Sequence, residues 1–398
     1  MTSIEIHAPK NFVLNLLSNP FYIKRLFAPY SSYIQQEAFQ IRYQAKTWGL
    51  IKTIERHIST VTPSSCRVHD TLSCSGMLPC LRYVHAYVLK EMKSLSQYQL
   101  ARIQQDAEYT FKNPFKPCSV LITGASGFIG SSLKTYLSAL GCTVYSLVRH
   151  VPNCPSEIQW DPDKGLIPLQ KIEGIDVFIN LSGASIAEKR WSASRMKLLK
   201  SSRLEATRTL VKAISQLKQP PRLFISMSGI SIYGKGTFLA KLAEDWEKEA
   251  QLASPKTRVV LLRTATVLSA LGGALPKITR SIRYGFAGRI GSGQQPLPWI
   301  SLYDLENLIL FCITHDEIAG PIDAVSSDVP TQKEFMRAIG KVIHRPTIIP
   351  LPALVVRLLF GKMGDELLLQ GISPPPTEEK FKFVPLLSFL KTEIGNNS

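Results

Sequence analysis

Residues 121–130 read LITGASGFIG, an apolar run followed by three glycines and the start of a second apolar run. The glycines Gly124, Gly127 and Gly130 are spaced three residues apart, between a predicted strand and a predicted helix. In a phosphate-binding turn, the first glycine allows the tight exit from the strand, the second admits the pyrophosphate, and the third lets the helix pack closely. The stretch therefore predicts a dinucleotide-binding loop rather than a plain turn.

Strands and helices alternate along the chain on the C-terminal side of this loop. Amphipathic helices separate continuous apolar runs, and the longest predicted helix covers 193–217. Such a rhythm is typical of an α/β fold, a Rossmann-type doubly wound parallel sheet that is buried on both faces. The predicted strands are CSVLIT (118–123), TVYSLV (143–148), EIQW (157–160), IDVFIN (175–180), RLFISMS (222–228) and RVVLLRT (258–264).

The first 112 residues follow a different pattern, which explains why the glycine loop begins so late. β-like runs, the longest over 40–58, precede a helix-like stretch over 94–111, and no glycine-rich loop occurs among them. This pattern predicts a separate, short α+β domain. The predicted parts are an N-terminal α+β domain (1–112), a proline-containing linker (113–117), a Rossmann domain (118–300) and a small C-terminal α/β extension (301–398).

Composition narrows the possible partners. The formal net charge of the 398 residues is +17, but the Lys and Arg residues are scattered, which favours a basic background over a nucleic-acid surface. Seven cysteines without a CxxC pair and seven histidines without ligand spacing predict neither a disulfide framework nor a metal site. We find no signal peptide and no apolar segment near the ~20 residues that span a bilayer, and expect a cytoplasmic protein with a small-molecule partner.

The second predicted strand bears on the choice of cofactor. An acidic residue usually follows this strand when the cofactor has a free 2′-hydroxyl, but this chain has Arg149 there. A guanidinium can hold a 2′-phosphate, so NADP is favoured and NAD stays possible. Asp161, after the third strand, could accept from the adenine amine or cap its own loop. The other predicted cofactor contacts are Ser126, Phe128 and Ile129 of the loop, Leu181, Ser182 and Gly183 after the fourth strand, and Arg263 at the end of the sixth.

Several longer stretches resemble a known family. They are LITGASGFIG, WDPDKG, INLSGASIAEKRW, SSRLEATRTLV, LLRTATVLSALGGALPK, GRIGSGQQPLPWISLYDL and FMRAIGKVIHRP, which together span residues 118 to about 390. The chain thereby resembles the epimerase-like subfamily of the extended short-chain dehydrogenase/reductases, also called nucleoside-diphosphate-sugar epimerases. The resemblance implies an NAD(P)-binding Rossmann fold with a C-terminal extension. The first 112 residues resemble, in shortened form, a START-like (polyketide cyclase type) domain, with matches at 8–9, 25–30 and 70–79.

Two of the catalytic residues that this resemblance implies are missing from the sequence. The superfamily uses a Tyr as acid/base, a Lys four residues later on the same helix face, and a Ser or Thr after the fifth strand. Ser228 is the candidate for the last role, with Ser226 as the alternative, but the Tyr and Lys positions fall on Phe238 and Leu242. Tyr233, in the shortened loop before this helix, is the substitute acid/base candidate, with packing as the alternative.

Two further stretches are candidates for the substrate side. Arg190 and Trp191 could hold an anionic substrate or form a packing pair at a helix start. Gln294, Gln295 and Trp299, in a loop rich in small and amide residues, are candidates for lining a cleft. Two functions stay open: an oxidoreductase or epimerase acting on a small polar or sugar-like substrate, and a non-catalytic NADP(H)-binding sensor or scaffold.

Overall fold

A computed structural model describes residues 2–6, 33–37, 40–47, 50–62, 65–75, 116–285, 288–375, 381 and 383–394. The chain divides into two compact units, Met1–Lys116 and Pro117–Ser398. The division falls inside the stretch predicted as a linker, and the boundaries at 112 and 300 stay predictions. The helix expected over 94–111 and the START-like matches at 8–9 and 25–30 lie outside the described residues.

The described part of the first unit is an antiparallel sheet of five strands in the order β1-β5-β4-β3-β2. The β-like run predicted over 40–58 belongs to a hairpin, in which Gln40 pairs with His57 and Thr47 with Leu50. Val68 is fully buried. The strands are β1 (Thr2–Ile6), β2 (Tyr33–Glu37), β3 (Gln40–Thr47), β4 (Leu50–Thr62) and β5 (Ser65–Ser75).

In the second unit, the described residues form a seven-stranded sheet in the order β15-β11-β10-β9-β6-β7-β8. Every pairing in it is parallel. The predicted α/β class is therefore confirmed. The strands are β6 (Ser119–Thr123), β7 (Thr143–Val148), β8 (Glu157–Gln159), β9 (Val177–Asn180), β10 (Leu223–Gly229), β11 (Arg258–Thr264) and β15 (Gly320–Ala324).

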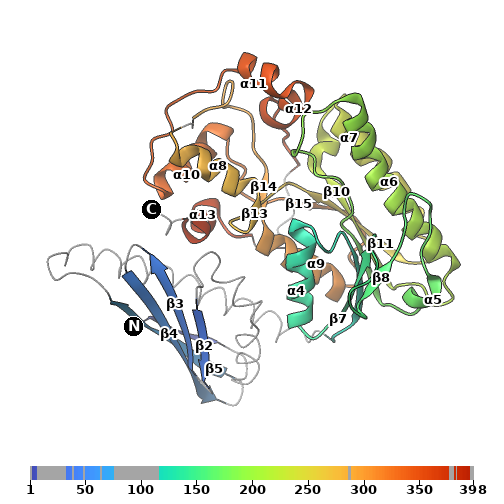
Figure 1. Ribbon diagram of the computed structural model, residues 1–398, viewed down its shortest axis with the longest axis horizontal. Helices are drawn as coiled ribbons and strands as arrows, with labels where there is room; N and C mark the ends of the chain where they lie inside the picture. Colours follow the sequence, from blue (N-terminus) through green and yellow to red (C-terminus); the bar gives the residue numbers. More distant parts are fainter. Residues whose placement is uncertain are drawn as a thin grey trace. The chain divides into compact units, whose positions relative to one another are not determined.

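Helices cover both faces of this sheet (Figure 1). On one face α4 packs beside α9, and on the other α6 packs beside α7. Leu210 and Ile214 of α6 share a buried cluster with Phe178 and Phe224 of the sheet. Burial from both sides explains why the strands are continuous apolar runs in the sequence. The helices are α4 (Phe128–Ala139), α5 (Leu169–Ile172), α6 (Ala193–Gln216), α7 (Phe238–Gln251) and α9 (Leu302–Thr314).

The C-terminal part adds short elements around a second buried cluster, which includes Trp299, Phe335 and Phe389. β15 follows residue 300, yet it pairs with β11 in the main sheet, so the parallel sheet continues past the predicted boundary. The elements are β12 (Thr266–Ser269), β13 (Gly272–Gly273), α8 (Leu275–Arg283), β14 (Trp299–Ser301), α10 (Gln332–Val342), α11 (Ala353–Phe360), α12 (Lys362–Gly364), the π-helix η3 (Asp365–Leu369) and α13 (Leu386–Ile394).

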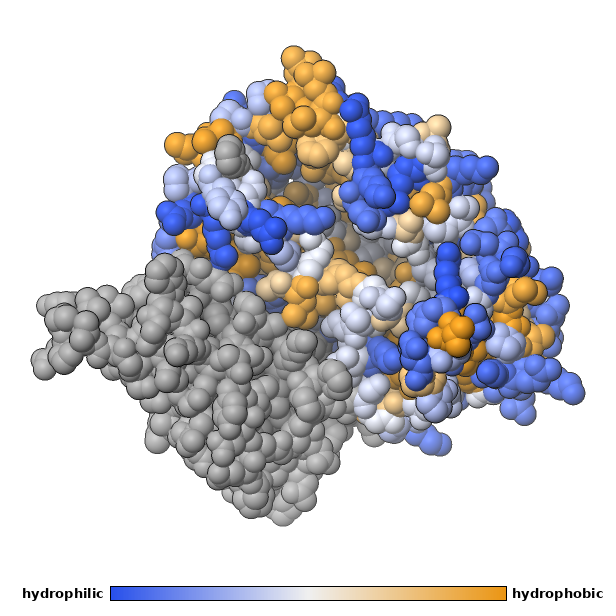
Figure 2. Space-filling model, in the orientation of Figure 1, coloured by the Kyte–Doolittle hydropathy of each residue, from blue (hydrophilic) through white to orange (hydrophobic). Residues whose placement is uncertain are grey.

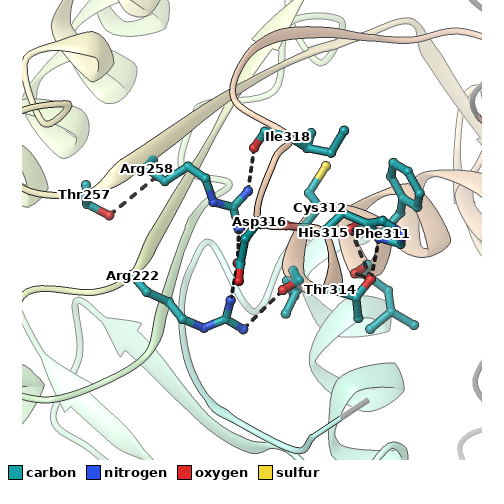
Figure 3. Close-up of polar contacts among 11 residues, drawn as sticks. Arg222, Thr257, Arg258, Phe311, Cys312, Thr314, His315, Asp316 and Ile318 are labelled. Atoms are coloured by element: carbon teal, nitrogen blue, oxygen red, sulfur yellow. Dashed lines mark hydrogen bonds and ion pairs between the residues drawn. The ribbon is translucent and has the colours of Figure 1, made fainter. Parts of the chain in front are cut away.

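A polar cluster of Arg222, Arg258 and Asp316, called the polar clamp, joins the segment between α9 and β15 to the amino edge of the sheet (Figure 3). Asp316, in the turn after α9, accepts from Arg222 at 3.0 Å and from Arg258 at 3.2 Å. The same two guanidinium groups donate to the backbone carbonyls of Ile313 and Cys312. Arg222 and Arg258 lie at the amino ends of β10 and β11. The contacts therefore hold the end of α9 at the amino edge of the sheet, opposite the edge where the strands end.

The order of the strands reverses at β6, which has β7 on one side and β9 on the other. Ligands of doubly wound sheets bind outside the carboxyl ends of the strands at such a reversal. The glycine loop leaves β6 at this point and continues into α4. The topology therefore indicates where a site should lie.

Close packing at the glycine loop yields a stability prediction. A Cβ added at Gly130 would lie 2.2 Å from the backbone oxygen of Gly124, which is rigid backbone. Gly130→Ala should therefore lower the free energy of unfolding of the second unit by about 3 kcal/mol, the range of overpacked cores. Urea titration followed by intrinsic tryptophan fluorescence measures this change, because four of the five tryptophans belong to the second unit.

Gly127→Ala is the matched control for that experiment. The nearest atom to a Cβ at Gly127 is the oxygen of Gly124 at 3.2 Å, and the φ of −75° suits alanine. We expect nearly wild-type stability. Equal losses in the two variants would contradict the packing explanation.

Candidate functional site

A cleft of about 930 Å³ opens at the carboxyl ends of the central strands. Its walls come from the glycine loop, the segments after β9 and β10, one face of α7, and the C-terminal part of the chain. Figure 2 shows the surface hollowed here, beside α7 and below α12. The predicted residues that line it are Gly124, Gly127, Phe128, Ile129, Gly130, Leu181, Ser182, Gly183, Ser228 and Gln295.

The glycine loop is shaped to hold an anion. Gly124 adopts a φ of +67°, and a Cβ there would lie 2.8 Å from the backbone oxygen of Leu181. The amide of Gly127 donates to the oxygen of Gly124 at 3.0 Å, which closes the turn. Gly127 caps α4 without any side-chain hydrogen bond, and the first turn holds no acidic residue. The amides at the positive end of α4 can therefore serve a phosphate.

Two predicted cofactor residues lie at a second hollow, next to β7 and β8. Arg149 and Asp161 both line it. Asp161 accepts from the backbone amides of Asp163 and Lys164 at 3.2 and 3.3 Å, which favours the loop-capping alternative for this carboxylate. Arg149 lies 3.6 Å from the Asp163 carboxylate, but both side chains are more than half exposed, so the pair is weak. Ser126 is exposed in the glycine loop.

A buried polar network lies behind Ser228. The Ser228 hydroxyl donates to Glu247 Oε1 of α7 at 2.7 Å. Arg263 holds the same carboxylate with Nε and Nη2, each at 2.8 Å. Through Nη1 it also donates to the Tyr233 hydroxyl at 2.9 Å. The Arg263 guanidinium is thus committed to Glu247 and Tyr233 and is not among the residues that line the cleft, so a cofactor contact for it stays a prediction.

Tyr233 links Arg263 to Asp323 at the end of this network, and it is not among the residues that line the cleft. Its hydroxyl donates to the Asp323 carboxylate at 2.8 Å. Burial, followed by the hydrogen bond to Asp323, raises the pKa of Tyr233 above its usual range. Burial also raises the pKa of Asp323. A tyrosine with a raised pKa that does not line the cleft is poorly placed as an acid/base there.

The cleft face of α7 carries no ionisable group. The residues of α7 that line the cleft are Leu239, Leu242, Ala243 and Trp246. Leu242 of the predicted pair lines the cleft, and two pairs spaced by four face it, Leu239 with Ala243 and Leu242 with Trp246. Phe238 instead packs edge-on against Trp191, with ring centroids 5.4 Å apart. In each of these pairs, apolar side chains occupy the positions of the missing Tyr and Lys.

Of the predicted substrate residues, Gln295 is among the residues that line the cleft, and the other four are not. Trp191 is 8% exposed and donates from Nε1 to the backbone oxygen of Ile186, which favours the packing alternative. Arg190 and Gln294 are exposed. Trp299 is fully buried, and its indole donates to the backbone oxygen of Asp328. Gln295 lines the cleft, but both hydrogens of its amide go to backbone oxygens.

Sequence reasoning missed three charged residues. Arg203 and Glu366 line the cleft, and Glu247 supports Ser228 from behind. Glu366 accepts from the amides of Phe238 and Leu239 at the start of α7. For Arg203 a signal existed: it stands in the apolar stripe of α6, four residues after Leu199 and seven before Leu210, positions where a charge is expensive.

Comparison with known proteins identifies the family. The family model described as NAD dependent epimerase/dehydratase matches residues 120–324. This chain belongs to that family. An epimerase family protein of Mycobacterium leprae is 36% identical over 268 residues, which cover 63% of this chain and 86% of the relative. The epimerase-like resemblance of the sequence is thereby confirmed.

Two solved structures of this family's fold are similar. Human epimerase family protein SDR39U1, solved with NADPH, is 31% identical with a TM-score of 0.63 and covers 70% of this chain and 99% of its own. A nucleoside-diphosphate sugar epimerase from Corynebacterium glutamicum is 21% identical with a TM-score of 0.65 and covers 94% of this chain and 91% of its own. The second likeness supports the fold alone.

Among the described residues, no helix is long and apolar enough to cross a membrane. In the same part of the chain, no three His, Cys, Asp or Glu side chains gather in a way that could hold a metal ion.

The polar network behind Ser228 generates a prediction. Tyr233→Phe removes the hydroxyl that bridges Arg263 and Asp323, and leaves a half-buried carboxylate without its donor. We expect the free energy of unfolding to fall by about 1–3 kcal/mol, measured by urea titration. Tyr145→Phe is the control, because no hydrogen bond joins the Tyr145 hydroxyl to any described residue. If both variants lose the same stability, the network has no structural role.

Proposed function

We propose that this protein is an NADP(H)-dependent oxidoreductase or epimerase that acts on a hydroxyl or carbonyl carbon of a small molecule. The observation that carries the proposal is the shared cleft. The glycine loop, with free amides at the start of α4, and the Ser228 hydroxyl, backed by Glu247, both open onto it. One cavity can thus hold a dinucleotide and a substrate side by side.

The residues present fit the cofactor. Gly127 leaves the approach to the α4 amides clear, and Gly124 and Gly130 allow backbone contacts that a Cβ would block. Arg149 lies after β7 with a guanidinium more than half exposed, where it can meet a 2′-phosphate. The human relative solved with NADPH supports the same choice. We therefore infer a preference for NADPH over NADH.

The Ser228 hydroxyl oxygen can accept a hydrogen bond from a substrate hydroxyl. Its own hydrogen goes to Glu247, so the lone pairs of Oγ are the groups available to the cleft. A substrate hydroxyl could donate to Oγ and release its proton there as the Ser228 proton moves to Glu247 Oε1. Bound nicotinamide would supply the hydride acceptor or donor. Arg263 keeps the Glu247 carboxylate oriented through two nitrogens.

One observation favours the alternative, a non-catalytic NADP(H)-binding sensor or scaffold. The cleft face of α7 is apolar at Leu239, Leu242 and Ala243, so no tyrosine or lysine there reaches the reacting atoms. Under this alternative the cleft binds the dinucleotide and Ser228 serves only to cap Glu247. A hydride-transfer assay separates the two functions.

The cofactor preference is tested with Arg149→Asp. The variant should weaken NADPH binding about 10- to 100-fold, because it removes a charge-assisted contact to the 2′-phosphate and adds repulsion, and should change NADH binding little. Fluorescence titration of the purified protein measures both constants. Arg208→Asp, the same charge change on an exposed arginine of α6, is the control. Equal losses for the two cofactors would overturn the role of Arg149.

The catalytic role of Ser228 is tested with 4-labelled NADPH and a panel of sugars, aldehydes and ketones. Ser228→Ala should lower transfer of the label about 100-fold or more while leaving the NADPH dissociation constant unchanged. Ser226→Ala is the control, because Ser226 is 1% exposed on the same strand and does not line the cleft. Absence of transfer from the wild-type protein to every substrate would favour the sensor alternative.

A further inference from the structure

Arg203 of α6 is a buried cation in the wall of the cleft. Its side chain lines the cleft, although the residue is only 7% exposed. Among the described residues that line the cleft, the only other charged one is Glu366. The Glu366 carboxylate accepts from the amides at the start of α7 and lies 3.9 Å from Lys362 Nζ, and no ion pair joins it to Arg203.

The contacts of Arg203 occupy one of its nitrogens. Nη1 donates to the backbone oxygens of Leu199 and Ala184, each at 3.1 Å. The guanidinium lies over the Trp246 ring, 5.2 Å from its centroid. Within the described residues, no carboxylate lies within ion-pair distance, and neither Nε nor Nη2 donates to another atom. The edge of the guanidinium formed by Nε and Nη2 is therefore available.

The same edge holds a carboxylate elsewhere in this protein. Arg263 binds Glu247 through Nε and Nη2, each at 2.8 Å. Two parallel N–H groups of a guanidinium match the two oxygens of a carboxylate. Arg263 uses its Nε and Nη2 groups to bind a carboxylate, and the same two groups of Arg203 are not used by the described residues.

Burial without a counter-ion is costly for Arg203. Desolvation, followed by the nearby charge of Arg195, lowers the pKa of Arg203 to about 10. A buried charge is normally paired, and an unpaired one is retained where function requires it. The cation-π contact with Trp246 offsets a part of this cost.

Gly183 makes room for this guanidinium. A Cβ at Gly183 would lie 2.9 Å from Arg203 Cζ, whereas a Cβ at Gly124 would meet the oxygen of Leu181. The segment 181–183 therefore contacts the glycine loop with its first residue and Arg203 with its last. Beyond this segment the guanidinium contacts Trp246 of α7.

The cleft around Arg203 is otherwise mostly apolar. Two sources supply this lining, the face of α7 and the C-terminal part of the chain. Such walls suit a hydrocarbon skeleton better than a sugar, whose hydroxyls need partners. The apolar residues include Met227, Leu239, Leu242, Ile290, Leu297 and Leu367.

We propose that Arg203 binds the carboxylate of an otherwise apolar substrate in this cleft. This inference rests on the proposed function, because it names the class of molecule that the site takes. The carboxylate lies against Nε and Nη2, and the apolar part lies along α7 and the C-terminal wall. The proposal names an apolar acid where the sequence predicts a small polar or sugar-like substrate, and both stay open until tested.

The test compares octanoate with octanol, which differ in the charged group. Calorimetric titration of the full chain, with and without saturating NADPH, should show octanoate binding at least about 10-fold tighter than octanol. Arg203→Met should lose this difference by weakening octanoate alone. Arg208→Met, the same change at an exposed arginine of the same helix, should keep it.

Equal binding of the two ligands by the wild-type protein, or equal losses of both in Arg203→Met, overturns the proposal. If Arg203→Met does not fold, Gly183→Ala takes its place, since the new Cβ displaces the guanidinium and should also weaken octanoate alone. Octanoate binding through Arg203 in a protein that binds no NADPH would uphold the carboxylate site and refute the proposed function.

Discussion

Two stretches of backbone meet without side chains between them at the carboxyl edge of the sheet, and the cleft depends on this contact. Gly124 lies against the oxygen of Leu181, and Gly130 lies against the oxygen of Gly124. The contact holds the end of β6 beside the end of β9. The first turn of α4 thereby lies in the wall of the cleft. Neither a phosphate-binding loop nor a substrate wall would face the same cavity if these backbones were held apart by a Cβ.

The polar residues behind this edge form a connected set that the helices bring together. Glu247 of α7 accepts hydrogen bonds from Ser228 of β10 and Arg263 of β11. Arg263 also donates to Tyr233, which in turn donates to Asp323 of β15. One cation thereby neutralises a buried carboxylate, while the second carboxylate accepts from a neutral hydroxyl. Since a buried charge is tolerated only with partners, this set ties three strands and α7 to one geometry.

Arg203 of α6 and Arg263 of β11 have surroundings that give them different roles. Arg263 has its carboxylate within the protein and therefore works as structure. Arg203 has carbonyls on one nitrogen and an aromatic ring on its face, and its remaining donors are not used by the described residues. Arg203 is also the more deeply buried of the two, at 7% exposed, whereas 18% of the Arg263 side chain is exposed.

Local patterns in the sequence were sufficient for the fold class and the glycine loop. The spacing of Gly124, Gly127 and Gly130 and the apolar runs of the strands are consequences of backbone geometry and two-sided burial, which act over a few residues. The predicted fold and family were confirmed for this reason. The place of Ser228 in the cleft wall could be predicted in the same way, because the apolar strand ends there at the edge where the loop lies, while its catalytic role stays a prediction.

Only the tertiary structure decided which polar side chains face the cleft. Trp299 and Arg190 stand in motifs that suggest a site, yet Trp299 is in the core and Arg190 is exposed and not among the residues that line the cleft. Arg203 stands in a helix stripe, and its partners come from residues 4 to 43 positions away. Pairing over such separations depends on how α6 and α7 pack, so sequence determined the scaffold and loop, while packing determined the chemistry of the cleft.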